Sequence, residues 1–251
     1  MRNTVKYGEI REILAIQRLP KDAEYIAWID ADVSFARPDW AEETIHQLQH
    51  YDVVQMFSTC HDLTPDFNPY QINQGFVYNY LKGSSPKDGY SKQKRNIVKS
   101  HPGYAWASKK SVLTKLGGLI DFAILGSADN YMAKALIGKA QEVVNDGFST
   151  EYKAWVFEWE QRALQIVKCN IGYVDGLLLH YFHFKKEYRK YYDRWKILID
   201  TDFQPTKDLV RNWQGVYSLS GNNHKLRDLC RAYFRQRNED CIHLEESAKI
   251  L

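Results

Sequence analysis

Two acidic residues at the end of a short apolar segment could bind a divalent cation. Tyr25–Ile29 is apolar and rich in β-forming residues, and Asp30-Ala31-Asp32 follows it directly. If the chain stays extended there, both carboxylates lie on one side, at the carboxyl end of a strand, where open α/β sheets bind ligands. Carboxylate oxygens suit Mg²⁺ or Mn²⁺, which commonly keep water and phosphate ligands. The same pair could instead cap backbone amides at a helix entry.

Two histidines could complete such a site. His180 and His183 are three residues apart and follow a second short apolar segment, Leu177–Leu179. A neutral imidazole can join carboxylates around a metal ion, manganese in particular. Either histidine is equally compatible with a packed or surface position, and the spacing does not choose between them as ligands.

Asp129 is placed where it could act as a general base. It lies two residues after Ser127, a residue type common at helix N-caps, at the start of a helical pattern that runs to Ile137. The helix dipole there favours the ionised carboxylate, which is the form that accepts a proton. The same description fits an ordinary aspartate in a first helical turn.

Alternating strand and helix patterns predict an α/β fold that would position these groups. Buried strands are expected over Tyr25–Ile29, Val53–Ser58 and Ile171–Val174. Helices are expected over about 38–50, 108–116, 127–137, 151–167, 185–199 and 223–236. The segment Cys60–His101 shows weak periodicity, and a long segment of that kind is more often functional than accidental. Its second half is rich in lysine, which could contact phosphates or simply be solvated.

Composition bounds the class of protein. The chain has 251 residues, 44% of them hydrophobic and 26% charged, with a net charge of +3, so it can bury a core and is not disordered. No apolar run approaches a membrane span, and Met1–Glu12 does not read as a secretory signal, so a cytoplasmic location is expected. The four cysteines are far apart, which favours reduced thiols.

Six blocks of sequence together resemble the GT-A-fold glycosyltransferases, and most closely a family-2-like group common in bacteriophage and bacterial genomes. They are YIAWIDAD at 25–32, RPDW at 37–40, HPGYAW at 101–106, LGGLID at 116–121, ILGSAD at 124–129 and HYFH at 180–183. The resemblance implies a GT-A-like catalytic domain with a mixed central sheet over residues 1–200. A helical extension over 201–251 would pack on it.

The resemblance also implies an activity, the transfer of a sugar from a nucleotide-sugar to an acceptor hydroxyl. The expected donor is a UDP-sugar, with Mn²⁺ or Mg²⁺ bound to its diphosphate. Asp32 would be a direct metal ligand, and Asp30 would reach the metal or the donor ribose. His180 or His183 would be a further metal ligand, and Asp129 the base of an inverting reaction. Two segments would shape the sugar and acceptor pocket, Gly103–Trp106 and Gly117–Gly118. On its pattern alone, Trp106 equally suits the core.

The chain departs from the family in one respect. Only about 25 residues precede the acidic strand, where the family places its first nucleotide-binding strands. The donor half would then be reduced, supplied by a second chain, or lost in a non-catalytic relative that binds a glycan or protein. A different acceptor, a modified base in DNA, is suggested by the basic loop and by three arginines at helical spacing, Arg227, Arg231 and Arg235.

Overall fold

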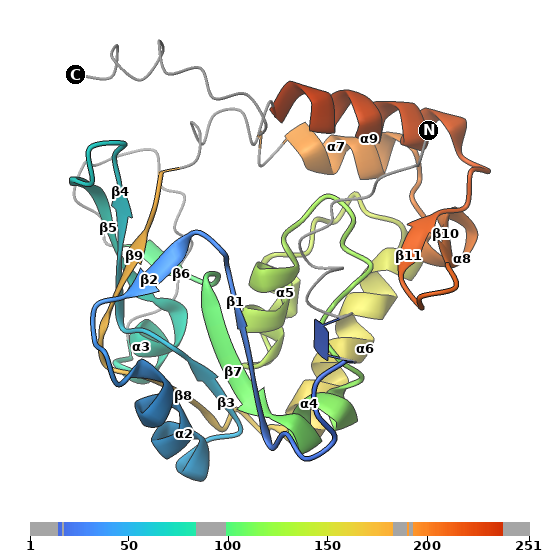
Figure 1. Ribbon diagram of the computed structural model, residues 1–251. Helices are drawn as coiled ribbons and strands as arrows, with labels where there is room; N and C mark the ends of the chain where they lie inside the picture. Colours follow the sequence, from blue (N-terminus) through green and yellow to red (C-terminus); the bar gives the residue numbers. More distant parts are fainter. Residues whose placement is uncertain (1–14, 17, 84–98, 183–189, 191–192, 238–251) are drawn as a thin grey trace.

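Figure 1 shows the computed structural model, which describes residues 15, 16, 18–83, 99–182, 190 and 193–237. The protein belongs to the α/β class and contains mixed sheets, as the sequence patterns predict. The strands of its two larger sheets gather on one side of the molecule, and helices α4, α5 and α6 lie together on the other (Figure 1).

The first of these sheets has four strands in the order β1-β7-β3-β8. β7 runs antiparallel to β1 and β3, whereas β3 and β8 are parallel. Helix α2 packs against β3, β7 and β8. The bounds of these elements are β1 (Tyr25–Ile29), β7 (Ala105–Lys109), β3 (Val53–Gln55), β8 (Ile171–Tyr173) and α2 (Trp40–His50).

The second sheet has five strands in the order β2-β9-β4-β5-β6. β9 and β4 are parallel, β2 is antiparallel to β9, and β4 and β5 form an antiparallel hairpin with a register shift between Asp62 and Leu63. The bounds are β2 (Val33–Phe35), β9 (Leu177–His180), β4 (Thr59–Leu63), β5 (Pro69–Gly75) and β6 (Lys99–His101).

Four short connections carry the chain from one sheet to the other and together form a seam, and a fifth passage, from β2 to β3, includes α2. The seam segments join β1 to β2, β3 to β4, β6 to β7, and β8 to β9: 30–32, 56–58, 102–104 and 174–176. Backbone hydrogen bonds extend the ladders into the seam: Asp30 N–H donates to the Tyr104 carbonyl at 2.8 Å, and Tyr181 N–H donates to the Asp32 carbonyl at 2.8 Å.

Helices enclose a large apolar core. Its largest fully buried side chains include Tyr131, Tyr152 and Phe203, and a second cluster around Leu48 and Phe57 fills the space near α2. The other helices are α3 (Phe76–Leu81), α4 (Lys110–Leu116), α5 (Ala128–Ala135), the 3-10 helix η1 (Ala140–Glu142), α6 (Thr150–Ile166), α7 (Asp193–Asp200), α8 (Pro205–Asp208) and α9 (His224–Arg237).

The region after residue 200 packs on α6 and α7 and shares the large core. Leu226, Cys230 and Tyr233 of α9 belong to that core, and Arg211 pairs with Asp121 at 3.0 Å. This region is not purely helical, because β10 (Leu209–Arg211) and β11 (Tyr217–Leu219) form a hairpin within it. Within the described part of the chain, no helix is long and apolar enough to cross a membrane.

Several sequence-based boundaries were wrong. The predicted strand Val53–Ser58 ends at Gln55, because the chain turns there into the other sheet. Cys60–His101 is not a long irregular loop in its described part, since it holds most of β4, all of β5 and α3, and β6. The predicted helix over 108–116 begins at Lys110, because the preceding residues form β7 between two other strands.

Gly172 of β8 provides a test of this packing. A Cβ atom at this position would overlap the Tyr51 ring at the end of α2. We expect Gly172→Ala to lower the free energy of unfolding by about 1–3 kcal/mol, since overpacking forces the ring or the strand to move. Urea denaturation would measure this loss. The double variant with Tyr51→Ala should show a favourable coupling energy, and strictly additive effects would contradict the packing.

Candidate functional site

A row of three polar side chains crosses three neighbouring strands of the second sheet beside the seam. Asp62 of β4 and His180 of β9 are direct partners in the parallel ladder, and Asp32 immediately precedes β2 on the other side of β9. His180 Nδ1 lies 2.7 Å from Asp62 Oδ1, and His180 Nε2 lies 3.6 Å from Asp32 Oδ2. The imidazole is therefore held between two carboxylates.

Tyr104 completes this cluster from the seam. Its hydroxyl donates to Asp62 Oδ1 at 2.6 Å and lies 3.1 Å from His180 Nδ1. Its ring stacks on His101 with centroids 3.9 Å apart and lies 4.4 Å from the His180 ring. Aromatic and hydrogen-bonding contacts thus fix Tyr104 on both sides.

The backbone of Tyr104 is strained. Its φ of +78° lies in the left-handed region, and Ala105 N–H donates to the Gly103 carbonyl at 3.2 Å across it. Such a conformation costs a non-glycine residue about 1–3 kcal/mol and is concentrated at functional sites. The tight turn directs the phenol into the cluster.

The Asp62 carboxylate is buried and compensated by three donors. Besides Tyr104 and His180, the Asn73 side chain donates to Oδ2 at 3.4 Å, and the Asp62 side chain is only 1% exposed. A buried carboxylate is costly unless it is hydrogen-bonded and paired, so these partners are needed to keep it ionised. The register shift at Asp62 belongs to the kind of bulge that re-aims a side chain near a site.

The cluster shifts the proton affinities of its members. Burial, and then the negative charge of Asp62, raises the pKa of Tyr104 far above its ordinary value, so the phenol stays protonated. Burial alone lowers the pKa of His180, but the hydrogen bonds and charges of Asp32 and Asp62 together outweigh it and raise this pKa.

Asp129 lies next to the same turn. A Cβ placed on Gly103 would be 3.0 Å from Asp129 Oδ2 and 3.2 Å from His101 Cε1, so the carboxylate approaches the Gly103 backbone closely. Asp129 is the second residue of α5, as expected for a residue in a first helical turn. The structure therefore brings this predicted base to the edge of the Tyr104 turn.

The predicted cap of α5 differs in detail. Ser127 is the N-cap residue, but its side chain makes no capping hydrogen bond. Its hydroxyl instead accepts from Arg194 Nη2 at 2.7 Å and from Trp195 Nε1 at 3.2 Å. Contacts from α7 therefore take the place of the local cap and hold the start of α5.

The acidic pair does not have the predicted extended geometry. Ala31 and Asp32 form a turn, because the chain leaves one sheet at Asp30 and enters the other at Val33. The extended chain that the alternation argument requires is therefore absent at Ala31 and Asp32. Asp32 joins the His180 row, whereas Asp30 is exposed beside it in the seam.

Two of the predicted pocket residues lie elsewhere. Trp106 of β7 is 5% exposed and packs in the large core, and its Nε1 donates to the Pro102 carbonyl at 2.8 Å. Gly118 follows α4, and its carbonyl accepts from Trp159 Nε1 of α6 at 3.0 Å. Of the two predicted pocket segments, Gly103–Trp106 reaches the His180 cluster, through Gly103 and Tyr104.

Other predicted residues fall outside the described ranges. His183 is one of them, as are the basic residues between Gly83 and Lys99 in the sequence. No group of three His, Cys, Asp or Glu side chains suited to a metal ion is found among the residues that the structure describes. Asp32 and His180 are the two predicted metal ligands that the structure brings together.

Sequence patterns did not single out Asp62 or His101 as site residues, and Tyr104 was included only as part of the predicted pocket segment Gly103–Trp106. Asp62 lies in the segment read as irregular, where no spacing rule marks it. A signal did exist for the other two, since HPGYAW carries glycine and aromatic residues at a turn before an apolar strand.

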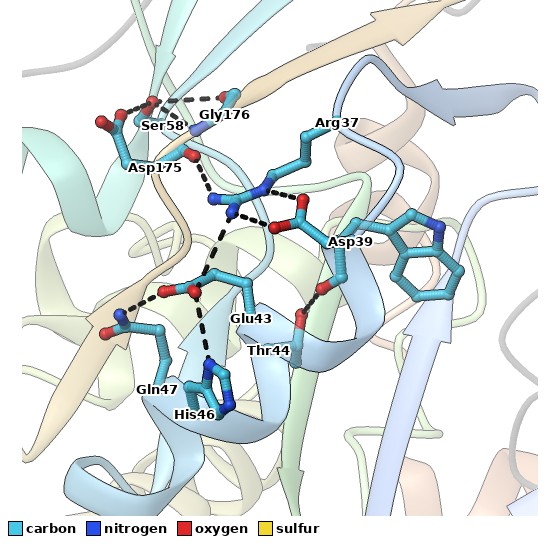
Figure 2. Close-up of polar contacts among 10 residues, drawn as sticks. Arg37, Asp39, Glu43, Thr44, His46, Gln47, Ser58, Asp175 and Gly176 are labelled. Atoms are coloured by element: carbon cyan, nitrogen blue, oxygen red, sulfur yellow. Dashed lines mark hydrogen bonds and ion pairs between the residues drawn. The ribbon is translucent and has the colours of Figure 1, made fainter.

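A second polar cluster lies at the opposite end of β9 and ties α2 to the seam (Figure 2). Arg37 donates to both Asp39 oxygens at 2.8 Å and to the Asp175 carbonyl at 2.8 Å. The Ser58 hydroxyl donates to Asp175 Oδ1 at 2.7 Å, which joins two seam segments. The RPDW block thus has a structural role in fixing the start of α2 against the connection between β8 and β9.

Comparison of the chain with protein-family models, with curated proteins and with solved structures found no match.

The Arg37–Asp39 pair leads to a prediction about proton binding. The Arg37 guanidinium lowers the pKa of Asp39 from 3.8 to about 2, chiefly through the two hydrogen bonds. Because the folded-state pKa is depressed, the stability from this pair is present above the unfolded pKa and is lost as pH falls through about 2. Carboxyl carbon NMR titration should give that midpoint, and Arg37→Gln should return it towards 3.8. An unchanged midpoint in the variant would contradict the pairing.

Proposed function

We propose that this chain is a metal-dependent glycosyltransferase of the GT-A type, which moves a sugar from a nucleotide-sugar to an acceptor hydroxyl. One observation carries the proposal: Asp32 Oδ2 and His180 Nε2 face each other at 3.6 Å beside the seam, and His180 is anchored from behind by Asp62. The antiparallel β7 inside an otherwise parallel arrangement and the sequence resemblance support it further.

The chemistry of the donor set fits a divalent cation. A carboxylate oxygen and an imidazole nitrogen suit Mn²⁺ well and Mg²⁺ less well. Asp32 and His180 would hold the ion, with Asp30 exposed at the same turn. Two protein ligands leave coordination positions for water and for diphosphate oxygens. When bound, such an ion would neutralise the charge that develops on a departing nucleoside diphosphate.

The chain itself would then supply a general base, Asp129, and the backbone of Gly103 beside it. Asp129 lies close to Gly103, and the next residue, Tyr104, contacts Asp62 and His180 through its hydroxyl. The Asp129 carboxylate would accept the proton of the acceptor hydroxyl while the hydroxyl oxygen bonds to the anomeric carbon and the bond to the diphosphate breaks. A side chain on Gly103 would approach that carboxylate to 3.0 Å and would require it to shift. A single displacement of this kind inverts the anomeric centre.

The arginine face of α9 gives less support to a nucleic-acid acceptor. Arg227 donates to Asp228 at 2.8 Å, and Arg231 lies 3.9 Å from the same carboxylate. An acidic residue therefore sits within the basic face and offsets part of its charge. A glycan or protein acceptor is the one we propose, with UDP-sugars as the first donors to test.

Removing Asp32 tests the proposal directly. Wild-type protein with Mn²⁺ should release UDP from one or more of a panel of UDP-hexoses, and Asp32→Ala should lower this rate by about 100-fold or more, as loss of a main charge-stabilising group does. Mn²⁺ binding, followed by the EPR signal of the free ion, should weaken in parallel. Asp22→Ala is a matched control, because Asp22 is exposed and precedes β1, the strand that Asp32 follows. Hydrolysis that persists in excess EDTA or in Asp32→Ala would contradict the proposal.

Asp129 should separate chemistry from metal binding. Asp129→Asn removes the proton acceptor but keeps the side-chain shape, so transfer to the acceptor should fall by about 10²–10⁴-fold. Mn²⁺ affinity should stay unchanged, since Asp129 is not part of the Asp32–His180 pair. Steady-state transfer rates and Mn²⁺ titrations on the same preparation would measure both. Wild-type rates in Asp129→Asn would exclude it as the base.

A further inference from the structure

The contact between Asp62 and His180 determines which histidine nitrogen can bind a metal. A carboxylate can only accept hydrogen bonds, so Nδ1 must carry the proton that bridges the 2.7 Å separation from Asp62 Oδ1. In the neutral imidazole the other nitrogen, Nε2, then carries a lone pair. That nitrogen is the one that faces Asp32.

Tyr104 could in principle favour the other tautomer of His180, in which Nε2 carries the proton and Nδ1 accepts a hydrogen bond. Its hydroxyl lies 3.1 Å from His180 Nδ1 and 2.6 Å from Asp62 Oδ1. A hydroxyl has one proton, and the shorter contact to the ionised carboxylate takes it. While Asp62 is present, Tyr104 therefore donates to the carboxylate and does not compete for Nδ1.

We propose that Asp62 is a positioning residue that holds His180 in the Nδ1–H tautomer and so keeps Nε2 available as a metal ligand towards Asp32. This inference rests on the proposed metal-dependent function, and it deepens that function by naming the buried group that orients the imidazole. Outer-shell carboxylates of this kind commonly change metal affinity by about 10–100-fold when removed.

Asp62→Ala tests the proposed tautomer directly, because the variant changes the hydrogen bond that the Tyr104 hydroxyl can make. Without the carboxylate, the Tyr104 hydroxyl loses its acceptor and can donate to Nδ1, which drives His180 to the Nε2–H tautomer. Long-range proton–nitrogen NMR of the metal-free protein, above the His180 pKa, would report the tautomer, with His180→Ala used to assign the signal. We expect Nδ1–H in the wild type and Nε2–H in Asp62→Ala.

Two further variants separate positioning from general destabilisation. Tyr104→Phe leaves the Asp62–His180 contact in place, so the Nδ1–H tautomer should remain. Asp66→Ala is the matched control, since Asp66 is exposed in the same β4–β5 hairpin, and it should behave as the wild type. Direct Mn²⁺ titration should give a loss of about 10–100-fold in affinity for Asp62→Ala and little change for Asp66→Ala.

The outcomes distinguish this inference from the proposed function. An Nε2–H tautomer in the wild type would overturn the inference, and this measurement needs no variant to fold. A folded Asp62→Ala protein with unchanged tautomer and Mn²⁺ affinity would also overturn it, even if Asp32→Ala loses all activity. Mn²⁺ that does not bind the wild type would instead remove the proposed function, while the tautomer would still decide the role of Asp62.

Discussion

The charge of Asp62, buried between strands, constrains everything around it. Taking a carboxylate out of water is costly, and it is tolerated here because Tyr104, His180 and Asn73 all direct donors at it. Two of these donors come from other parts of the chain, so satisfying the charge also fixes the seam. The left-handed backbone of Tyr104 is unfavourable by itself and persists because its hydroxyl meets this need.

The position of the cluster follows from the way the two sheets are joined. Each of the four seam segments must end one ladder and begin another within about three residues, which produces turns and backbone groups that bond across the seam. Some seam side chains, such as Phe57 and Val174, are buried in the second apolar cluster, and others are polar. Asp30, Asp32 and Tyr104 all lie in seam segments, and His101 ends β6 at its border. The sheets thus collect polar groups from distant parts of the sequence along one line.

Sequence patterns predicted the strands and helices whose formation depends on neighbouring residues in the sequence. The apolar strand Tyr25–Ile29 was predicted with its full bounds, and the helix predicted over 151–167 is α6, with Ser149 accepting from Tyr152 N–H as its cap. The seam could not be predicted, because the segment Val53–Ser58 contains no glycine or proline to mark a break. Only the partner strands show that the ladder changes after Gln55. Asp62 was missed for the same reason, since its partners are 42 and 118 residues away.

The outer end of the row is more exposed than its inner end. Here the side-chain exposure rises from 1% at Asp62 to 10% at His180 and 32% at Asp32. The inner contact is a hydrogen bond of 2.7 Å, whereas the outer separation of 3.6 Å exceeds one. In the neutral imidazole two acceptors would face each other across that outer gap, so a positive charge belongs between them. A proton or a metal ion would provide it.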